Sequence, residues 1–205
     1  MKSNEELIQN YIRHISAMKM IHANDIPSIP LYMDQITTFI NEGLATSRRY
    51  EDDKIMTKTM INNYAKNALL PSPEKKKYSK EHVILLLFIY YFKNILSISD
   101  IQALLNPITE KYFQGQKGID LAALYDTIRE QEAKSRKDVL ADLARISEQS
   151  AELFQDAENP EELQRFAFIC LVSYDVYMKK MLLEQLVDEI RAEEENSGKK
   201  DHRHG

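Results

Sequence analysis

The sequence contains few of the residues that characterise disulfide-rich or turn-rich proteins. Its 205 residues include one cysteine, no tryptophan, five glycines and six prolines. A single cysteine excludes an internal disulfide and agrees with a reducing cytoplasm, which is the location we predict. That residue, Cys170, lies in the apolar stretch FAFICLVSYDVY and is predicted to be a small core residue. The scarcity of glycine and proline disfavours a turn-rich β fold and suits long helices.

Long apolar runs and a secretory leader are also missing. The most apolar segment, Val83 to Phe92, has ten residues, whereas a membrane-spanning helix needs about 20. No apolar segment follows Met1-Lys2-Ser3, so a secretory signal is not expected. We therefore expect the protein to make no contact with a membrane.

Motifs for catalysis and cofactor binding are absent as well. The sequence has no GxxxxGK[ST], GxGxxG, HExxH, CxxC or GxSxG pattern. His202 and His204 lie in a charged tail, which favours a frayed end over a metal site. His82, beside a lysine cluster, is interpreted as a half-buried helix residue, with donation to a phosphate as the alternative. The chain is therefore predicted not to be an enzyme and to bind neither cofactor nor metal.

Charge is distributed unevenly along the chain. The net charge is −5 overall, yet residues 57–81 contain six lysines and two glutamates, a local net charge of +4. A basic segment in an acidic chain is expected where one face binds a polyanion and the rest stays soluble. A solvated lysine loop explains the cluster equally well when the cluster is considered alone.

The basic segment begins with a short predicted helix. Thr57 is a suitable N-cap, and apolar or small residues at helical spacing predict a helix over 57–68 with a polar outer face. Pro71 and Pro73 follow the helix and terminate it, because proline lacks an N–H and restrains the residue before it.

A basic turn and a strongly apolar helix come next. Lys75 to Lys77 precede Ser79, which is a suitable N-cap for a helix predicted over 79–94. Because Val83 to Phe92 is apolar on every face, this helix must be covered on all sides by other parts of the chain or by a second subunit.

In this order, the features resemble the DNA-binding domain of MerR-type regulators. In that family a recognition helix runs into a Leu-Leu-Pro turn and a basic wing, followed by a Tyr-Ser-x-Glu start of a long helix and a Ser-capped final helix. The matching residues here are Leu69-Leu70-Pro71, Lys75 to Lys77, Tyr78-Ser79-Lys80-Glu81 and Ser97-Ile98-Ser99-Asp100. The resemblance implies a winged helix-turn-helix domain that binds double-stranded DNA as a dimer.

The resemblance also implies which residues contact DNA. Asn62 or Asn63 would reach base edges, since an amide can bind adenine through two hydrogen bonds. The other implied contacts are Lys58, Thr59, Lys66, Lys75, Lys76, Lys77 and Tyr78. In the preceding loop, Arg48 and Arg49 either touch phosphate or form surface ion pairs with the acidic residues 51–53.

The sequence departs from the MerR-type pattern in three places. It has Thr59 and Asn62 where those helices usually carry two arginines, and Ala68 where they carry glycine. The segment from Gly43 to Met56 is also longer than the turn of about three to four residues in a tight helix-turn-helix.

A second resemblance covers more of the chain. The stretches LYMDQITTFIN and KKKYSKEH are similar to an uncharacterised bacterial family of domain-of-unknown-function type, number 1836. This second resemblance implies no established activity.

Helical patterns also account for the remaining segments. An amphipathic helix is predicted over 4–22, and another over 31–41 with Gly43 as its C′ residue. Beyond Pro107 we expect a loop that contains Gly115 and Gly118.

Two long helices are predicted after this loop. The first covers about 120–154 and breaks or projects near 129–138, where apolar residues are scarce. The second begins with Pro160 at its first position.

We therefore predict an all-α fold with a MerR-like winged helix-turn-helix head, a small basic wing and a C-terminal helical hairpin or bundle. The expected parts are an N-terminal helix (1–26), the head (27–107), a dimerisation or effector region (108–192) and a disordered tail (193–205).

Two functions agree with these features. The first is a cytoplasmic bacterial transcription regulator that binds DNA through helix 57–68 and wing 74–78, as a homodimer whose C-terminal region is available to an unidentified small-molecule effector. The second is a non-enzymatic protein-interaction module with a winged-helix-like fold that does not bind DNA. The missing arginines and the overall acidity favour this second function.

Overall fold

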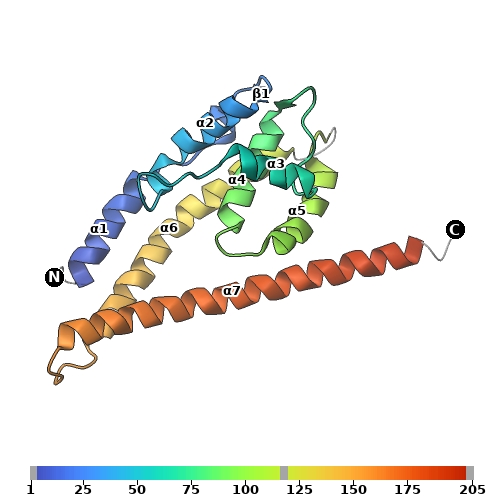
Figure 1. Cartoon of the computed structure of the whole chain (residues 1–205). Coiled ribbons are helices and arrows are strands. Elements are labelled where there is room, and N and C mark those ends of the chain that lie inside the picture. The colour runs from blue at the N-terminus through green and yellow to red at the C-terminus, as the bar shows by residue number, and fades with distance from the viewer. Residues whose placement is uncertain (1–3, 116–119, 202–205) are drawn as a thin grey trace. The chain divides into compact units, whose positions relative to one another are not determined.

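The structure is a computed structural model that describes residues 4–115 and 120–201, with backbone alone for 197–201. Helices dominate this described part, and one small antiparallel sheet accompanies them (Figure 1). The predicted all-α class is confirmed at this level. In chain order the elements are α1 (Asn4–Ala17), η1 (Ala23–Asp25), β1 (Leu31–Tyr32), α2 (Met33–Gly43), η2 (Ala45–Ser47), α3 (Lys58–Lys66), β2 (Lys77–Tyr78), α4 (Lys80–Phe92), α5 (Ile98–Tyr112), α6 (Leu121–Ala151) and α7 (Pro160–Asp201).

The chain divides into two compact units. One, the head unit, comprises residues 19–129 and 182–205, and the other, the helical unit, comprises residues 1–18 and 130–181. Residues 108–129 therefore belong with the head, whereas the sequence patterns placed them in the C-terminal region. Within the described ranges, no helix combines the length and apolar character needed to cross a membrane.

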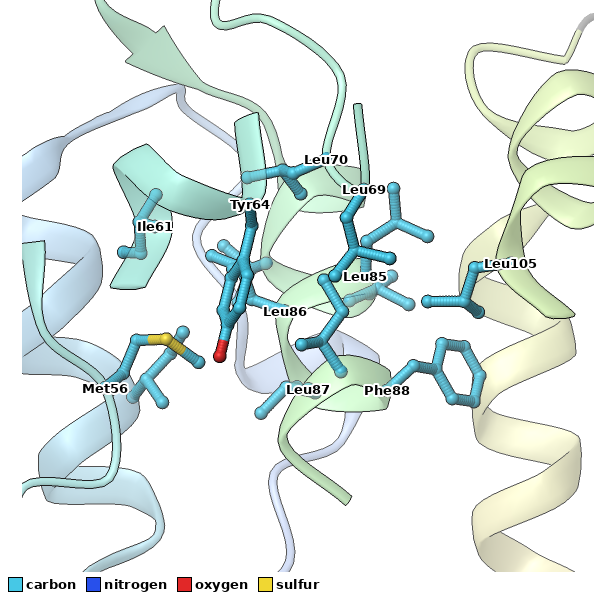
Figure 2. Packing of buried hydrophobic residues seen from close by; sticks show 14 of the residues in the cluster. Met56, Ile61, Tyr64, Leu69, Leu70, Leu85, Leu86, Leu87, Phe88 and Leu105 are labelled. Carbon is cyan, nitrogen blue, oxygen red and sulfur yellow. The ribbon is translucent and has the colours of Figure 1, made fainter. Parts of the chain in front are cut away.

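Helix α4 is the centre of the head unit. Every residue from His82 to Ile89 is buried, and each buried apolar side chain contributes about 1.5–3 kcal/mol. Figure 2 shows Tyr64 of α3 and Leu105 of α5 on opposite sides of the α4 side chains. Tyr125 of α6 and Val187 of α7 are also in this core. The predicted need for cover on every side is confirmed, and other parts of the chain supply it.

The N-terminal boundaries differ from the predicted ones because of packing in the head. Helix α1 ends at Ala17 instead of residue 22, and Ile21 belongs to the core of the head. Gly43 is the last residue of α2, not its C′ residue. A Cβ at position 43 would lie 2.5 Å from Cδ1 of Ile21. Gly43 therefore lies inside the helix end and not at the predicted C′ position, and Ile21 would have to move to admit a side chain there.

Helix α5 also extends beyond its predicted end. The loop expected after Pro107 is helical as far as Tyr112. Ile108 and Tyr112 pack against the core, and this burial offsets the helix-breaking tendency of proline, which is about 3 kcal/mol. Gly118 lies outside the described residues.

The two long helices are more continuous than their sequences suggest. Helix α6 runs without a break through 129–138, and α7 continues to Asp201 where a disordered tail was predicted. In the head unit, Arg191 of α7 donates a 2.7 Å hydrogen bond to Asp100 of α5. This attachment gives α7 a packed partner beyond the apolar stretch. His202 and His204 lie outside the described residues.

The apolar stretch around Cys170 in α7 is not part of a core. Cys170 is exposed, and Phe166 and Tyr174 of the same stretch are 65% and 64% exposed. The described residues of the helical unit leave this side of α7 uncovered. The predicted core position of Cys170 was therefore wrong.

Candidate nucleic-acid interface

Helix α3 presents a polar face to solvent. Oγ1 of Thr57 accepts a hydrogen bond from the backbone N–H of Met60 at 3.2 Å, so the predicted N-cap is confirmed. Ile61 and Tyr64 are buried against the core. The predicted contact residues of this helix are all exposed: Lys58, Thr59, Asn62, Asn63 and Lys66.

The end of α3 is a Schellman motif built on alanine. The N–H of Leu69 donates to the carbonyl of Tyr64 at 2.9 Å, and the N–H of Ala68 donates to Ala65 at 3.3 Å. This is the pair of bonds that closes a Schellman motif. Ala68 has the positive φ of 56° that usually selects glycine. Alanine in place of the family's glycine therefore leaves the turn intact, at the cost of backbone strain at Ala68.

The triple-lysine segment forms a tight hairpin. The N–H of Lys77 donates to the carbonyl of Glu74 at 2.9 Å. The two residues between them, Lys75 and Lys76, have φ values of 49° and 65°. Two consecutive positive φ angles are the mark of a type I′ turn, which favours Asn-Gly. For a non-glycine residue this conformation costs roughly 1–2 kcal/mol each, so the two lysines are held in a strained and exposed turn.

A short sheet attaches the hairpin to the start of α2. Leu31 pairs with Tyr78, and Tyr32 pairs with Lys77. Nζ of Lys77 lies 5.0 Å from the centre of the Tyr32 ring, within the range of a cation–π contact. Tyr78 is 3% exposed, and burial raises the pKa of its hydroxyl. Tyr78 therefore belongs to the core and is not exposed for the predicted contact with DNA.

The start of α2 also contacts α3. Asp34 forms an ion pair with Lys58, and Tyr32, two residues earlier, contacts Lys77. The first residue of α3 and the hairpin are thus both attached to one short segment of β1 and α2. We call the exposed residues Lys58, Thr59, Asn62, Asn63, Lys66, Lys75, Lys76 and Lys77 the basic surface.

The long connection between α2 and α3 is fastened by Asn41. Its side-chain amide donates to the carbonyl groups of Thr37 and Met56, both at 2.7 Å. Its Oδ1 accepts from the N–H of Ile55 at 3.0 Å. Lys93 donates to the Ile55 carbonyl at 2.9 Å, and burial lowers the pKa of this lysine. The connection is longer than a tight turn, but these bonds fix its end just before α3.

The two arginines of this connection lie differently. Nη2 of Arg48 donates to the carbonyl of Asn41 at 2.8 Å, and the side chain is half-buried. Arg49 is exposed and lies 5.2 Å from the centre of the Tyr50 ring. Arg48 thus serves the fold, whereas Arg49 is accessible to an anion. Within the described residues, neither arginine forms an ion pair with the acidic residues 51–53; their contacts are with the Asn41 carbonyl and the Tyr50 ring.

His82 has a structural position at the start of α4. Its Nδ1 accepts the backbone N–H of Ser79 at 3.0 Å and lies 2.8 Å from Oγ of Ser79, so the ring caps the start of the helix. The ring is 3% exposed. Burial lowers the pKa of His82, although the carbonyl groups of Ser72 and Pro71 oppose this effect. The position of His82 therefore favours the prediction of a helix residue, here fully buried, over the alternative of a phosphate donor.

Sequence reasoning missed Asn41 and Lys93. Both act on backbone groups 14 or more positions away, since Asn41 reaches Ile55 across 14 positions and Lys93 reaches it across 38. No local pattern of residue types marks such partners. Only the fold brings them together.

Residues 21–128 match a family model described as a domain of unknown function, DUF1836. The chain belongs to this family. The DUF1836 match almost coincides with the 19–129 part of the head unit and contains the whole basic surface. Searches of curated proteins and of solved structures gave no match.

Proposed function

We propose that the DUF1836 domain of this protein is a MerR-like winged helix-turn-helix domain that binds double-stranded DNA. Helix α3 would be the recognition helix and the 74–78 hairpin the wing. In this proposal the protein is a bacterial transcription regulator in the cytoplasm. The observation that carries the proposal is the exposed pair Lys75 and Lys76 in a strained turn.

The backbone strain at Lys75 and Lys76 matters because a turn that only connects two strands can be built from residues that adopt positive φ without strain. Asn-Gly would close the same turn with little cost, whereas two lysines retain roughly 1–2 kcal/mol of strain each. Strained residues persist at sites where they serve function. Two exposed ammonium groups at the tip of a hairpin suit contacts with phosphate.

The remaining basic surface divides into two roles. Asn62 and Asn63 have amides that can read base edges in the major groove. Lys66 and Lys77 can neutralise phosphates. Lys58 is paired with Asp34, but both side chains are largely exposed at 60% and 74%. Such a surface pair contributes only about 0–1 kcal/mol, so a phosphate can replace Asp34.

A turn replacement separates charge from structure. The double variant Lys75→Asn/Lys76→Gly removes two positive charges and installs the preferred type I′ pair. We expect it to be more stable than the wild type by about 1–2 kcal/mol and to bind DNA more weakly. If both lysines contact phosphate, the log–log salt slope becomes shallower by about 1.8. Gel shifts with random genomic duplexes over a salt series measure this slope.

The matched control removes the same charge elsewhere. Lys134→Asn/Lys137→Asn changes two exposed lysines of α6 in the helical unit and is expected to leave DNA binding unchanged. Equal weakening by both double variants would indicate a non-specific charge effect. Affinity insensitive to salt, or unaffected by the turn replacement, would reject the DNA-binding proposal.

The alternative is a protein-interaction module that does not bind DNA. The inward bond of Arg48 and the ion pair of Lys58 favour it, since both reduce the number of cations available to phosphate. In this case no duplex is retained even at low salt, and the same basic surface binds an acidic protein. Gel shift and pull-down with the full chain distinguish the two functions.

A further inference from the structure

A small cavity lies between the hairpin and the start of α4 in the head unit. Its volume is about 250 Å³, whereas one water molecule occupies about 30 Å³ in the liquid, so a small polyatomic ion fits inside. Two lysines, two serines and one histidine contribute to its lining: Ser72, Lys75, Lys77, Ser79 and His82. Ser72 and both lysines are exposed, so the cavity opens to solvent, and the buried His82 forms its floor.

The charges around the cavity favour an anion. Among the described lining residues, Lys75 and Lys77 bring two positive charges and Glu74 brings one negative charge, which leaves a net charge of +1. A second acid nearby, Glu81, is not part of the lining, and its Oε1 accepts the backbone N–H of Gln114 at 2.8 Å. Helix α4 also begins here, and the first N–H groups of a helix add partial positive charge because they have no partner within it.

His82 supplies a buried hydrogen-bond donor that has no acceptor. Its Nδ1 accepts the N–H of Ser79, so the neutral ring carries its proton on Nε2. Nε2 is buried and has no hydrogen-bond partner among the described residues, although the carbonyl groups of Pro71 and Ser72 lie close enough to affect the pKa of the ring. Buried donors are normally satisfied, so Nε2 indicates a missing acceptor.

The burial of His82 limits what that acceptor can be. A ring that is 3% exposed cannot reach a phosphate of the DNA backbone, which stays outside the protein. It can donate only to a group that enters the cavity. Phosphate suits this surrounding, since lysine ammonium groups and helix N-termini are both common phosphate ligands, and the hydroxyl groups of Ser72 and Ser79 can donate to further oxygens.

We propose that this cavity binds a phosphate group, either as the inorganic ion or as the terminal group of a small molecule. Lys75 and Lys77 line the cavity and also belong to the basic surface. A phosphate held inside therefore engages two of the cations that the proposed function assigns to DNA, and the cavity becomes a site where phosphate opposes DNA binding. This last step rests on the proposed function, whereas the binding of phosphate does not.

The first test is a titration of the full chain with inorganic phosphate in the absence of DNA. Ionic strength is held constant with sodium chloride, and the pH is about 7.5, above the ordinary histidine pKa of about 6.5. Calorimetry should show saturable binding. In NMR spectra, the ring signals of His82, assigned by their loss in His82→Gln, should shift along the same binding curve. A parallel titration with glycerol phosphate shows whether the free ion or a phosphate ester binds more tightly.

The matched variants separate the cavity from the rest of the basic surface. Lys75→Gln/Lys77→Gln should raise the dissociation constant for phosphate at least tenfold, because two charge-assisted contacts are lost. Lys66→Gln/Lys76→Gln removes the same charge from residues that do not line the cavity and should leave phosphate binding nearly unchanged. Absence of saturable binding, equal weakening by both double variants, or His82 signals that do not move would each overturn the proposal.

A third variant tests the link to DNA. Ser72→Leu fills part of the cavity and keeps every lysine, so it should lose phosphate binding and retain DNA binding. Phosphate should weaken the wild-type gel shift more than chloride at equal ionic strength, and this excess should vanish in Ser72→Leu. An excess that persists in the variant would refute the link. If the wild type binds phosphate but no duplex at any salt concentration, the proposed function fails and the cavity site stands.

Discussion

Three residues carry a left-handed backbone within the basic surface and its border. Lys75 and Lys76 are exposed and charged, and in the proposed function their strained turn presents both ammonium groups to phosphate. Ala68 is also exposed, but its methyl group offers nothing to a ligand. Its positive φ follows from the need to close α3 before Leu69 and Leu70 enter the core. At this position a side chain adds backbone strain that glycine would avoid.

Ala68→Gly is therefore expected to stabilise the protein. Glycine adopts this conformation without the clash of a Cβ, and the gain is about 1 kcal/mol. The control is Ala65→Gly, three positions earlier in right-handed helix, which should lose about 0.5–1 kcal/mol. Urea unfolding of the three proteins measures both changes. A loss of stability in Ala68→Gly would show that the alanine methyl group makes a contact worth more than the strain.

At the scale of elements, the start of α4 depends on a titratable cap. Nδ1 of His82 accepts the N–H of Ser79, and only an unprotonated Nδ1 can accept a hydrogen bond. Tyr78 and Phe113 contact the ring edge to face at 5.4 Å and 4.8 Å. Burial among these rings keeps the imidazole neutral, against the opposing effect of the Ser72 and Pro71 carbonyl groups, so acid acts on the helix start and the hairpin beside it.

The sign of the resulting pH dependence is fixed. Burial lowers the pKa of His82 in the folded protein below the value of about 6.5 in the unfolded chain. The contribution of the neutral ring to stability is therefore complete above about pH 6.5 and declines as the pH falls toward the folded pKa. Thermal unfolding of the wild type should show this decline.

His82→Gln provides the comparison for this prediction. Glutamine at the third helical position can also accept the N–H of an N-cap serine, but it does not titrate. The difference in stability between wild type and variant should narrow as the pH falls below about 6.5. A difference that stays constant over this range would contradict the assignment to His82.

At the scale of the whole molecule, the two units have unequal cores. The head unit buries every residue of α4 from His82 to Ile89. In the helical unit, the buried apolar residues among those described are Ile8 and Ile146. Local opening costs least where few apolar contacts are broken. The helical unit should therefore open more readily than the head.

Hydrogen exchange of the full chain tests this inequality. Amides of residues 83–89 in α4 should exchange slowest, through global unfolding, and those of residues 132–150 in α6 should exchange faster, through local opening. Low concentrations of denaturant should accelerate the first group more than the second, because global unfolding exposes more surface. Equal protection in both segments would mean that the two units unfold together.

Local signals were sufficient for several elements. Thr57 and Ser97 cap helices as their residue types indicate, and Pro160 begins α7 as predicted. The outward side chains of α3 are exposed as their spacing requires. Each of these features depends on hydrogen bonds or periodicity within a few residues, which is why the amino-acid sequence alone determined them.

Only the tertiary structure decided which residues are covered and by what. Tyr78 lies in a basic segment yet is buried, and Cys170 lies in an apolar segment yet is exposed. Gly43 packs closely against Ile21, and Pro107 stays helical because residues beyond it reach the core. In each case the deciding free energy comes from a partner far along the chain, and the sequence around the residue does not specify that partner.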